Sequence, residues 1–328
     1  MSDTDTDTEP ETASGPEAPA PAPVVSILIV NYNTRELTLD CLRSIAAETR
    51  IPHETIVVDN ASRDGSADAI AAAFPDVKLI RSAENLGFGC GNNRAAELAS
   101  GEYILLLNSD TVVLDGAIDK LVAFAREMPQ AQMWGGRTLF PDGRINPQSG
   151  WRLPSTWNIF CRTAGLNALF PNSPLFHSEA YAGWRRDSVR SVEMIIGCYL
   201  MTTREMWDKL RGFDEQLFMY GDDVDLCFRA RKLGADPHVT PESTIIHYGG
   251  SSDTVRADKV VKLMRGKISV VQRHFGWDKP IALGILRLWP FTRVAAMTVL
   301  APIRPSLAPK RDVWGEIWRQ RAVWWNGY

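Results

Sequence analysis

The chain has 328 residues, of which 45% are hydrophobic and 23% charged, and its formal net charge is −3. These values are ordinary for a globular protein and allow one large domain or two smaller ones with a substantial core. The five cysteines are scattered without a CxxC pair, which argues against a disulfide scaffold or a zinc cluster and indicates a reducing compartment. No basic segment followed by an apolar one opens the chain, so we expect a cytoplasmic protein.

The two ends of the chain differ in charge. Residues 1–23 contain six acidic residues, no Lys or Arg and many Pro and Ala, which predicts a disordered tail because little apolar surface can be buried. Residues 256–328 contain fourteen Lys and Arg against four Asp and Glu, which favours an anionic partner. We expect a membrane surface and no nucleic acid, because no recognised nucleic-acid-binding module carries the basic residues.

The first part of the folded chain, residues 24–130, alternates short apolar segments with amphipathic ones. The β-branched apolar runs predict strands at residues 24–33, 54–62, 77–82 and 103–110. The amphipathic segments predict helices at residues 36–48, 64–74 and 91–100, the last closed by Gly101. This alternation predicts βαβ units, and therefore an α/β fold with a mostly parallel sheet covered by helices on both faces.

The alternation breaks down from about residue 131. Residues 140–190 are rich in Pro, Gly, Trp and Arg, and we predict that they are irregular and partly mobile. Order returns with a predicted strand at residues 191–203, a helix that opens near Asp222, and a predicted strand at residues 243–252.

The last part of the chain, residues 256–328, is predicted to form a helical extension that contains six of the eleven tryptophans. Its apolar run at residues 281–303 is long enough to span a bilayer. Arg287, Pro290 and Arg293 interrupt this run, so a position in the membrane interface fits better. The alternative is a helical subdomain that packs on the rest of the protein.

Polar residues follow the predicted strands where a parallel sheet binds ligands, beyond the carboxyl ends of the strands. These residues are Asn31, Asp59, Asn60, Asn108 and Asp110. Asp59 could accept hydrogen bonds from a nucleobase or start an Asx turn. Asp110 could bind a divalent cation that carries a diphosphate, or cap the next helix. The residues alone leave both pairs of alternatives open.

A glycine-rich turn, "ENLGFGCGNN", lies between a predicted strand and a predicted helix. Gly87 and Gly89 fit a dinucleotide fingerprint, but Asn92 stands where that fingerprint needs its third glycine, and the turn follows the third strand rather than the first. The pattern therefore argues against a nicotinamide oxidoreductase. We expect a turn whose backbone comes close to a nucleotide.

Three carboxylates, Asp222, Asp223 and Asp225, crowd the start of the helix predicted within "GDDVDLCFRARKLG". All three could serve as helix caps, but capping requires only one carboxylate, so three acids indicate chemistry as well. At 3.6 residues per turn, Asp222 and Asp225 share one face of the helix while Asp223 points roughly 100° away. Asp225 is therefore a candidate for capping or for pairing with a nearby arginine.

Several motifs occur in an order that resembles family 2 glycosyltransferases, and most of all their rhamnosyltransferase-like branch. They are "VSILIVNYN", "IVVDNASRDGS", "NLGFGCGNN", "LLLNSD", "RGFDEQLFMY", "GDDVDLC" and "IIHYGGSS". The similarity runs from Val25 to Ser252. It implies a GT-A fold, with a Rossmann-like sheet flanked by helices and a C-terminal helical extension. Residues 24–130 would bind the nucleotide sugar, and residues 131–255 would bind the acceptor and carry out catalysis.

The resemblance also implies roles for single residues. Asp223 would be the general base of an inverting transfer, and Asp222 would orient acceptor hydroxyls. By the same resemblance, Asp110 and His247 would hold a divalent cation, Mg²⁺ or Mn²⁺. From the residues themselves, Trp184 could stack on a sugar, so Trp184 and Asp225 are candidate acceptor contacts together with Asp222. The implied donor-binding residues are Asn31, Asn33, Asp59, Asn85, Gly87, Asn93, Asn108 and Asp110.

Two positions depart from the family pattern. Asn108 replaces the first acid of the metal-binding motif, and Asp222 stands where a Glu usually precedes the catalytic Asp. For two further residues, a purely structural role is the alternative to a role in binding. His247 could be a buried histidine at a strand end, and Trp184 could be an aromatic residue folded onto the core.

The resulting hypothesis is a glycosyltransferase that moves a sugar from a nucleotide-diphosphate donor to a hydroxyl of a glycan or lipid-linked acceptor, in cell wall or polysaccharide biosynthesis. Deoxythymidine-diphosphate-rhamnose (dTDP-rhamnose) is the first expected donor, and a uridine-diphosphate hexose (UDP-hexose) is the second. The enzyme would be cytoplasmic and peripheral on the inner face of the cell membrane. A non-catalytic sugar-nucleotide-binding protein of the same fold is the alternative, and Asn108 keeps it open.

Overall fold

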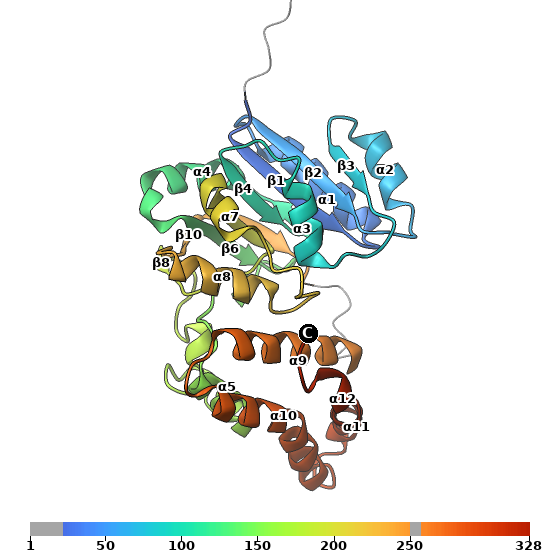
Figure 1. Ribbon diagram of the computed structural model, residues 1–328, viewed down its shortest axis with the longest axis vertical. Coiled ribbons are helices and arrows are strands. Elements are labelled where there is room, and N and C mark those ends of the chain that lie inside the picture. Colours follow the sequence, from blue (N-terminus) through green and yellow to red (C-terminus); the bar gives the residue numbers. More distant parts are fainter. Residues whose placement is uncertain (1–21, 250–256) are drawn as a thin grey trace, which may run out of the picture.

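The computed structural model describes residues 22–249 and 257–328, which form two layers (Figure 1). The upper layer is a 10-stranded sheet with helices on both faces, and the lower layer consists of helices. The predicted disordered tail lies outside the described residues except for Ala22 and Pro23. The end of the strand predicted at residues 243–252 also lies outside them, from Gly250 onward.

The first half of the sheet has the predicted parallel arrangement. Its strands pair in the order β3-β2-β1-β4, and they are β1 (Val25–Asn31), β2 (His53–Asp59), β3 (Lys78–Arg81) and β4 (Tyr103–Leu107). The helices between them are α1 (Arg35–Glu48), α2 (Ser66–Ala73) and α3 (Phe88–Ala96). Asn31 pairs in register with Asp59, so both side chains leave the sheet at the same edge.

One helix boundary differs from the prediction. Helix α3 ends at Ala96 rather than beside Gly101. Gly101 instead precedes β4, where a Cβ atom would lie 2.7 Å from the backbone nitrogen of Ser26. This glycine is therefore required by a close approach to β1 and not by the end of the helix.

The second half of the sheet is mixed. Its strands are β5 (Thr111–Val113), β6 (Met133–Leu139), β7 (Ile145–Asn146), β8 (Arg190–Ser191), β9 (Tyr199–Thr203) and β10 (His238–His247). Strand β9 lies antiparallel between β4 and β6, whereas β10 is parallel to β6. The sheet is therefore continuous across the boundary that the sequence suggested near residue 130.

The strand predicted at residues 191–203 is wrong in its first part. Only β8 and β9 pair within the sheet, and residues 192–198 leave it between them. Met194 forms an isolated bridge with Trp151, and the backbone nitrogen of Asn108 donates to the carbonyl of Cys198 at 3.2 Å. Residues 192–198 are therefore not part of a strand, and they contact Trp151 and Asn108 beside the site described below.

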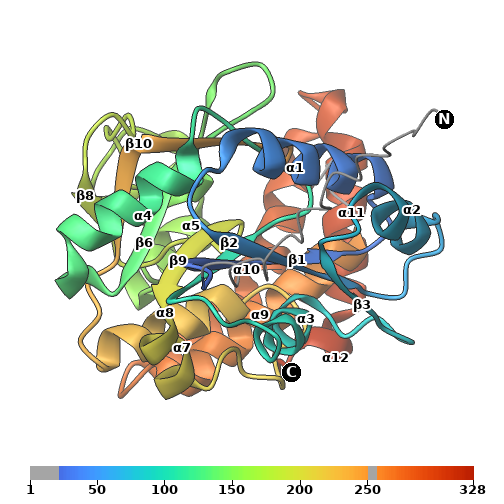
Figure 2. The ribbon, with the colours of Figure 1, turned by 90° about the horizontal axis from the view of Figure 1, so that it is seen from above.

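Helices cover both faces of the sheet. Helix α4 (Ala117–Glu127) lies with α1 on one face, while α7 (Arg204–Leu210) and α8 (Asp222–Lys232) lie with α3 on the other (Figure 2). The strands supply both cores because successive side chains point to opposite faces. In β1, Ile27 and Ile29 join the first apolar cluster, whereas Leu28 joins the second.

The region predicted to be irregular, residues 140–190, contains one helix of more than two turns. Helix α5 (Thr156–Ala164) begins after Ser155, whose hydroxyl accepts a hydrogen bond from the backbone nitrogen of Asn158. It ends at Gly165, which has a φ of 80°. The rest consists of the two-residue strand β7, the first residue of β8, the short helix α6 (Leu166–Leu169), brief 3-10 turns and loops.

The C-terminal helices form the lower layer with α5. They are α9 (Ala257–His274), α10 (Lys279–Leu300), α11 (Ala308–Arg319) and α12 (Arg321–Trp324). They share an apolar cluster with α5, which includes Ile159, Met264, Leu286, Ile317 and Trp324. The helical subdomain that the sequence offered as an alternative is therefore present.

Helix α10 continues through Pro290 and is the one helix of the described residues that is long and apolar enough to cross a membrane. Its arginines bond within the helical layer. Arg287 donates to the carbonyl of Trp325 at 2.9 Å, and Arg293 donates to the carbonyl of Arg162 at 2.6 Å. These contacts hold the first two thirds of α10 in the layer, whereas Val299 and Leu300 near its end are exposed.

Candidate active site

Asn31 and Asp59 form a hydrogen-bonded pair at the carboxyl ends of β1 and β2. The Asn31 amide donates to Asp59 Oδ1 at 2.7 Å, and Asp59 Oδ2 accepts from the backbone nitrogen of Ser62 at 3.2 Å. The hydroxyls of Thr34 and Thr38 donate to Asn31 Oδ1 at 2.7 and 2.8 Å. Asp59 therefore starts a turn and is held in a fixed orientation at the same time.

The loops after β2 and β3 are tied together by Asn60. Its side chain accepts from the backbone nitrogen of Leu86 at 2.9 Å and donates to Asn85 Oδ1 at 3.0 Å. It also donates to the carbonyl of Gly87 at 3.1 Å. Asn33, with a φ of 54°, accepts from the backbone nitrogen of Arg63 at 2.8 Å. These contacts bring Asn33, Asn85 and Gly87 to the rim that Asn31 and Asp59 begin.

The glycine-rich turn makes its close approaches to protein. A Cβ atom on Gly87 would lie 2.4 Å from the carbonyl oxygen of Phe218, and one on Gly91 would lie 2.9 Å from Val30. Asn93 in α3 donates to the carbonyl of Phe213 at 2.9 Å and accepts from its backbone nitrogen at 2.8 Å. The turn and Asn93 therefore anchor the segment that leads into α8, and Asn93 is directed to that segment rather than to the rim.

Asn108, Asp110 and His247 meet beside this rim. His247, at the end of β10, has its Nε2 atom 3.2 Å from Asn108 Nδ2 and 3.3 Å from Asp110 Oδ1. Burial disfavours the charged imidazole, but the neighbouring Cys198 and Asp110 outweigh burial and raise the pKa of His247 to about 10. The other ring nitrogen, Nδ1, is buried without a hydrogen-bond partner among the described residues.

These side chains fit a small divalent-cation site. A carboxylate oxygen and a neutral imidazole nitrogen can coordinate one ion together, so a cation would have to displace the proton that the raised pKa of His247 favours. Such an ion can complete its coordination with phosphate oxygens and water. The described residues contain no group of three or more His, Cys, Asp or Glu side chains that could hold a metal. The two protein ligands would therefore need the diphosphate of a substrate to complete the site.

The three acids of the "GDDVDLC" motif occupy different environments. Asp225 pairs with Arg229, as the sequence indicated, at 2.7 Å, and it also pairs with His274 at 2.7 Å. Burial raises the pKa of Asp225, but hydrogen bonds and charge from His274 and Arg229 outweigh burial and lower it overall. Asp225 does not line the cavity that lies between α8 and the helical layer and is described below. Its carboxylate instead fixes α8 against α9.

Asp222 and Asp223 carry raised pKa values. Burial, with a smaller contribution from Asp223, raises the pKa of Asp222 to about 7. Burial also raises the pKa of Asp223, against the hydrogen bonds from the backbone nitrogens of Val224 and Gly197. The two carboxyls titrate as a pair because each affects the other. A carboxylate of raised pKa is a stronger base than an exposed one.

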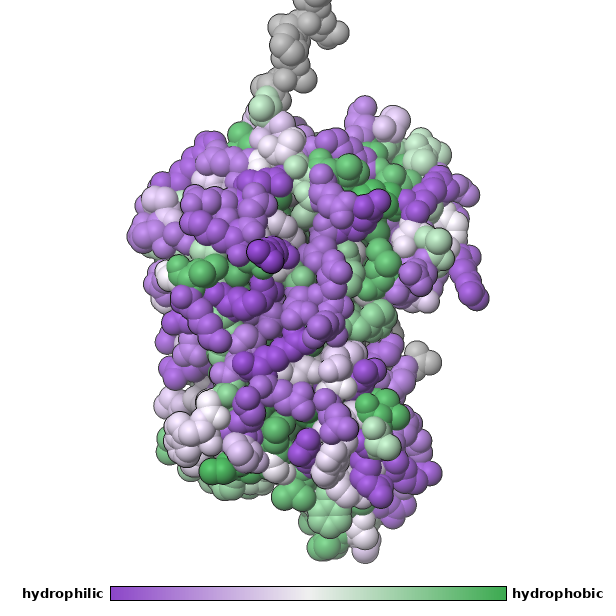
Figure 3. Space-filling view, in the orientation of Figure 1, coloured by the Kyte–Doolittle hydropathy of each residue, from purple (hydrophilic) through white to green (hydrophobic). Residues whose placement is uncertain are grey.

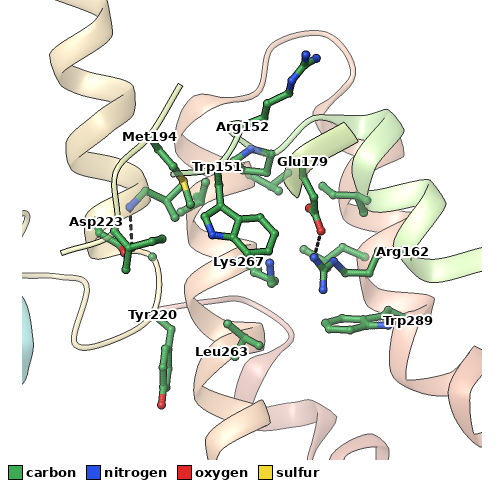
Figure 4. A pocket seen from close by; sticks show the side chains of 18 of the residues that line it. Trp151, Arg152, Arg162, Glu179, Met194, Tyr220, Asp223, Leu263, Lys267 and Trp289 are labelled. Atoms are coloured by element: carbon green, nitrogen blue, oxygen red, sulfur yellow. Dashed lines mark hydrogen bonds and ion pairs between the residues drawn. The ribbon is translucent and has the colours of Figure 1, made fainter. Parts of the chain in front are cut away.

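A cavity of about 540 Å³ lies between α8 and the helical layer (Figure 4). Asp223 lies at one side of it and the ion pair of Arg162 with Glu179 at the other, with Lys267 between them. Most of the remaining wall is apolar and includes Trp151, Met194, Leu263, Leu286 and Trp289. The cavity thus joins a basic carboxylate to an apolar chamber that contains cations.

Trp184 does not line this cavity. Its ring is buried in the second apolar cluster, 6.0 Å from the ring of Tyr181, and the guanidinium of Arg186 lies 4.8 Å from its centroid. Arg186 is itself buried and donates to the carbonyls of Pro147 and Gly150 at 3.2 and 3.3 Å. Trp184 is therefore an aromatic residue folded onto the core, which was the structural alternative for this residue.

Apart from Asp223, sequence reasoning missed the residues that line the cavity, including Trp151, Arg162 and Lys267. One of them carried a signal. Leu263, Lys267 and Val270 follow the i, i+4, i+7 spacing of a helix face, so a lysine interrupts an otherwise apolar stripe. Trp151 and Arg162 carried no such signal, because a loop and the short helix α5 bring them to the cavity.

Comparisons with known proteins agree with this architecture. Residues 26–192 match Glycosyl transferase family 2. The chain is 30% identical over 251 residues to the N-acetylglucosaminyl-diphospho-decaprenol L-rhamnosyltransferase of Mycobacterium tuberculosis, which covers 72% of this chain and 80% of that protein. It is 29% identical over 248 residues to the O-antigen biosynthesis protein RfbC of Myxococcus xanthus, which covers 72% of this chain and 18% of that protein.

A solved structure shares the fold. It is a mannosyltransferase from Pyrobaculum calidifontis in complex with GDP-Man and Mn²⁺, with a TM-score of 0.55 and 18% identity over 93% of this chain and 86% of that chain. This likeness supports the GT-A fold alone. The family match spans half of the chain, and the mycobacterial relative resembles most of it. The chain therefore belongs to glycosyl transferase family 2 and is a glycosyltransferase of GT-A fold.

Proposed function

We propose that this glycosyltransferase inverts the anomeric centre and uses Asp223 as its general base. The single observation that carries the proposal is the position of Asp223. Its carboxylate has a raised pKa and lines the cavity, while the segment that leads to it is anchored to the glycine-rich turn at the rim of the sheet. A general base placed between the polar rim of the sheet and the largely apolar cavity suits a reaction that joins two different substrates.

The reaction assigned to Asp223 is proton removal from the acceptor. Its carboxylate accepts the proton of the attacking hydroxyl as the oxygen forms a bond to the anomeric carbon. The bond between this carbon and the diphosphate oxygen breaks on the opposite face, and the electron pair leaves with the diphosphate. Asp222 orients acceptor hydroxyls in this proposal, and the pairs of Asp225 with Arg229 and His274 hold α8 in position.

The rim of the sheet would bind the nucleotide sugar. Asp59, held by Asn31, is proposed to accept hydrogen bonds from the base, and Asn33, Asn85 and Gly87 line the same rim. Asp110 and His247 would hold Mg²⁺ or Mn²⁺ there, beside Asn108. When bound, such a cation offsets the negative charge that develops on the leaving diphosphate.

The identity of the substrates is proposed from the relatives. The mycobacterial protein is named for rhamnosyl transfer to an N-acetylglucosaminyl-diphospho-decaprenol, which supports dTDP-rhamnose as the first donor and a lipid-linked glycan as the acceptor here. A UDP-hexose is the second donor. A role in cell wall or polysaccharide biosynthesis follows from the same relatives.

A lipid-linked acceptor agrees with an exposed apolar end of the helical layer. Val299, Leu300 and Ile303 are 73%, 45% and 78% exposed, and Figure 3 shows apolar side chains gathered at this lower end of the molecule. Arg304 and Lys310 are exposed nearby. We name these five residues the α10 tip. We propose that the α10 tip contacts the inner face of the cell membrane, with apolar side chains in the interface and cations at lipid phosphates.

The test of the proposed function is a donor screen. Purified protein is incubated with dTDP-rhamnose and UDP-hexoses, with Mn²⁺ or Mg²⁺ or with EDTA, and the released nucleotide is measured. We expect slow hydrolysis of one donor that EDTA removes. With an acceptor, the anomeric configuration of the product is read by NMR, and inversion is expected. Retention of configuration, or full activity in EDTA, would contradict the proposal.

A further inference from the structure

Lys267 is a half-buried basic residue in the wall of the cavity. It projects from α9 into the cavity between Asp223 and Arg162 (Figure 4). Its ammonium forms neither a hydrogen bond nor an ion pair with another described residue. Burial and the neighbouring charge of Arg162 lower the pKa of Lys267 to about 7, although Asp223 acts in the opposite direction. A cation kept inside a protein without a partner costs free energy, which a bound anion would offset.

The walls around Lys267 suit the apolar part of a ligand. Leu263 and Val270 lie one turn before and after it on α9, and Leu286 and Trp289 approach from α10. The volume of about 540 Å³ is within the range of small-molecule sites and exceeds what a single anion needs. A ligand that fills the cavity would therefore combine an anionic group with a hydrocarbon segment.

The approach of α9 to the catalytic segment is part of this arrangement. Gly266 precedes Lys267, and a Cβ atom at Gly266 would lie 1.3 Å from the carbonyl oxygen of Tyr220. Only glycine permits this contact. It brings Lys267 next to the turn that precedes Asp222 and Asp223, so the lysine and the base face the same ligand.

We propose that the cavity is an acceptor subsite for a phosphate-linked lipid, in which Lys267 binds the phosphate and the apolar walls of α9 and α10 hold the first carbons of the chain. The sugar that the phosphate carries then extends toward Asp223. This assignment rests on the proposed function for the identity of the acceptor, but its binding chemistry can be tested without any sugar transfer. Lys267 is a substrate-positioning residue here, and not the base.

The test measures the binding of farnesyl diphosphate by calorimetry, without nucleotide and in EDTA, so that a metal-dependent donor site does not contribute. Farnesol and inorganic pyrophosphate are measured in parallel. The variants are Lys267→Gln, the charge-preserving Lys267→Arg, and Lys262→Gln, which removes an exposed lysine from the same helix. Asp110→Asn controls for binding at the rim of the sheet. Thermal unfolding shows that each variant is folded.

Farnesyl diphosphate is expected to bind more tightly than either farnesol or pyrophosphate. Lys267→Gln should weaken its binding at least about tenfold, because a charge-assisted contact to phosphate is lost. Lys267→Arg should retain most of the affinity, and Lys262→Gln and Asp110→Asn should stay within about twofold of wild type. Equal binding by Lys267→Gln, or equal affinity for farnesol, would overturn the proposal, and equal affinity for pyrophosphate would reduce the site to one for a bare anion.

The outcome is independent of the proposed function. Asp223→Asn should lose sugar transfer without weakening the affinity for farnesyl diphosphate, because it removes a negative charge from the cavity and leaves Lys267 in place. If the wild-type protein binds this probe through Lys267 but transfers no sugar from any donor, the proposed function fails and the lipid-phosphate site stands. If it transfers sugar but Lys267→Gln binds the probe normally, the proposed function stands and the site is wrong.

Discussion

The rim of the sheet and the cavity below α8 hold their polar side chains in different ways. At the rim, Asn31, Asp59 and Asn60 are already engaged in hydrogen bonds with neighbouring side chains and backbone. In the cavity, Asp223 and Lys267 are half-buried charges, and neither forms an ion pair with another described residue. The polar groups of the rim are therefore already oriented by the protein, whereas the two ionisable side chains of the cavity are not committed to an ion pair within the part of the chain that the structure describes.

The two regions should respond differently to substitution. A rim built from strand ends is stabilised by the sheet itself, because each polar residue follows a buried strand. The cavity depends on segments that lie far apart in the chain and meet through long-range packing. They include residues 148–154, 194–196 and 220–224 together with α5, α9 and α10. Substitutions in the cavity should therefore separate sugar transfer from donor binding.

Asp223→Asn should produce the largest effect. We expect sugar transfer to fall about 10²- to 10⁴-fold, because the variant removes a general base and little volume. Donor affinity at the rim should stay within about twofold. The measurements are the steady-state transfer rate and nucleotide-sugar binding. Asp208→Asn, an exposed residue on α7, is the matched control and should leave both unchanged. Transfer at the wild-type rate by the Asp223 variant would remove this residue from the mechanism.

Gly266→Ala should have the next largest effect. Its new methyl group would collide with the carbonyl of Tyr220, so α9 must move away from the catalytic turn. We expect a loss of about 1–3 kcal/mol in unfolding free energy, with transfer reduced more than donor hydrolysis. Urea unfolding and both rates are the measurements. Gly284→Ala on α10, where nothing lies within 4 Å of the added atom, should not destabilise the protein. Equal behaviour of the two variants would contradict the close contact.

The sequence predicted the rim better than the cavity, for physical reasons. Asn31, Asp59 and Asp110 lie at strand ends, so a local pattern of apolar and polar residues locates them. Arg162 and Trp151 come from a region without clear periodicity, and only the folded chain brings them to α9. The sequence identified the three acids at the start of α8. The structure shows that Asp225 forms ion pairs with Arg229 and His274. The second partner lies 49 residues away in the chain, which no local pattern encodes.

Asp222→Asn should change the pH dependence of stability. Burial raises the pKa of Asp222 from 3.8 to about 7, so between these values the folded protein binds a proton that the unfolded chain has released. Folding is thus favoured at low pH, and this contribution is lost as the pH rises through about 7. Relative to wild type, the variant should gain stability from about pH 5 to about pH 8. Urea unfolding at both pH values is the measurement, and a constant difference would mean that Asp222 titrates normally.

The smallest effect is expected at the α10 tip, far from both sites. Replacing Val299 and Ile303 together by serine should reduce binding to vesicles rich in anionic lipid by about tenfold, because two exposed apolar side chains leave the interface. Liposome flotation is the measurement. Transfer to a water-soluble acceptor should not change. Val189→Ser removes an exposed valine from the sheet layer and is the control. Flotation like that of wild type would exclude the α10 tip as the membrane contact.

We propose above all that Asp223 faces the reacting carbon of a sugar whose nucleotide occupies the rim of the sheet. A crystal structure with an unreactive donor analogue and Mn²⁺ tests it most directly. We expect the nucleobase beside Asp59, the diphosphate beside Asp110 and His247, and the anomeric carbon open toward the carboxylate of Asp223. A bound donor whose anomeric carbon points away from Asp223, or a nucleotide bound outside the rim, would contradict it.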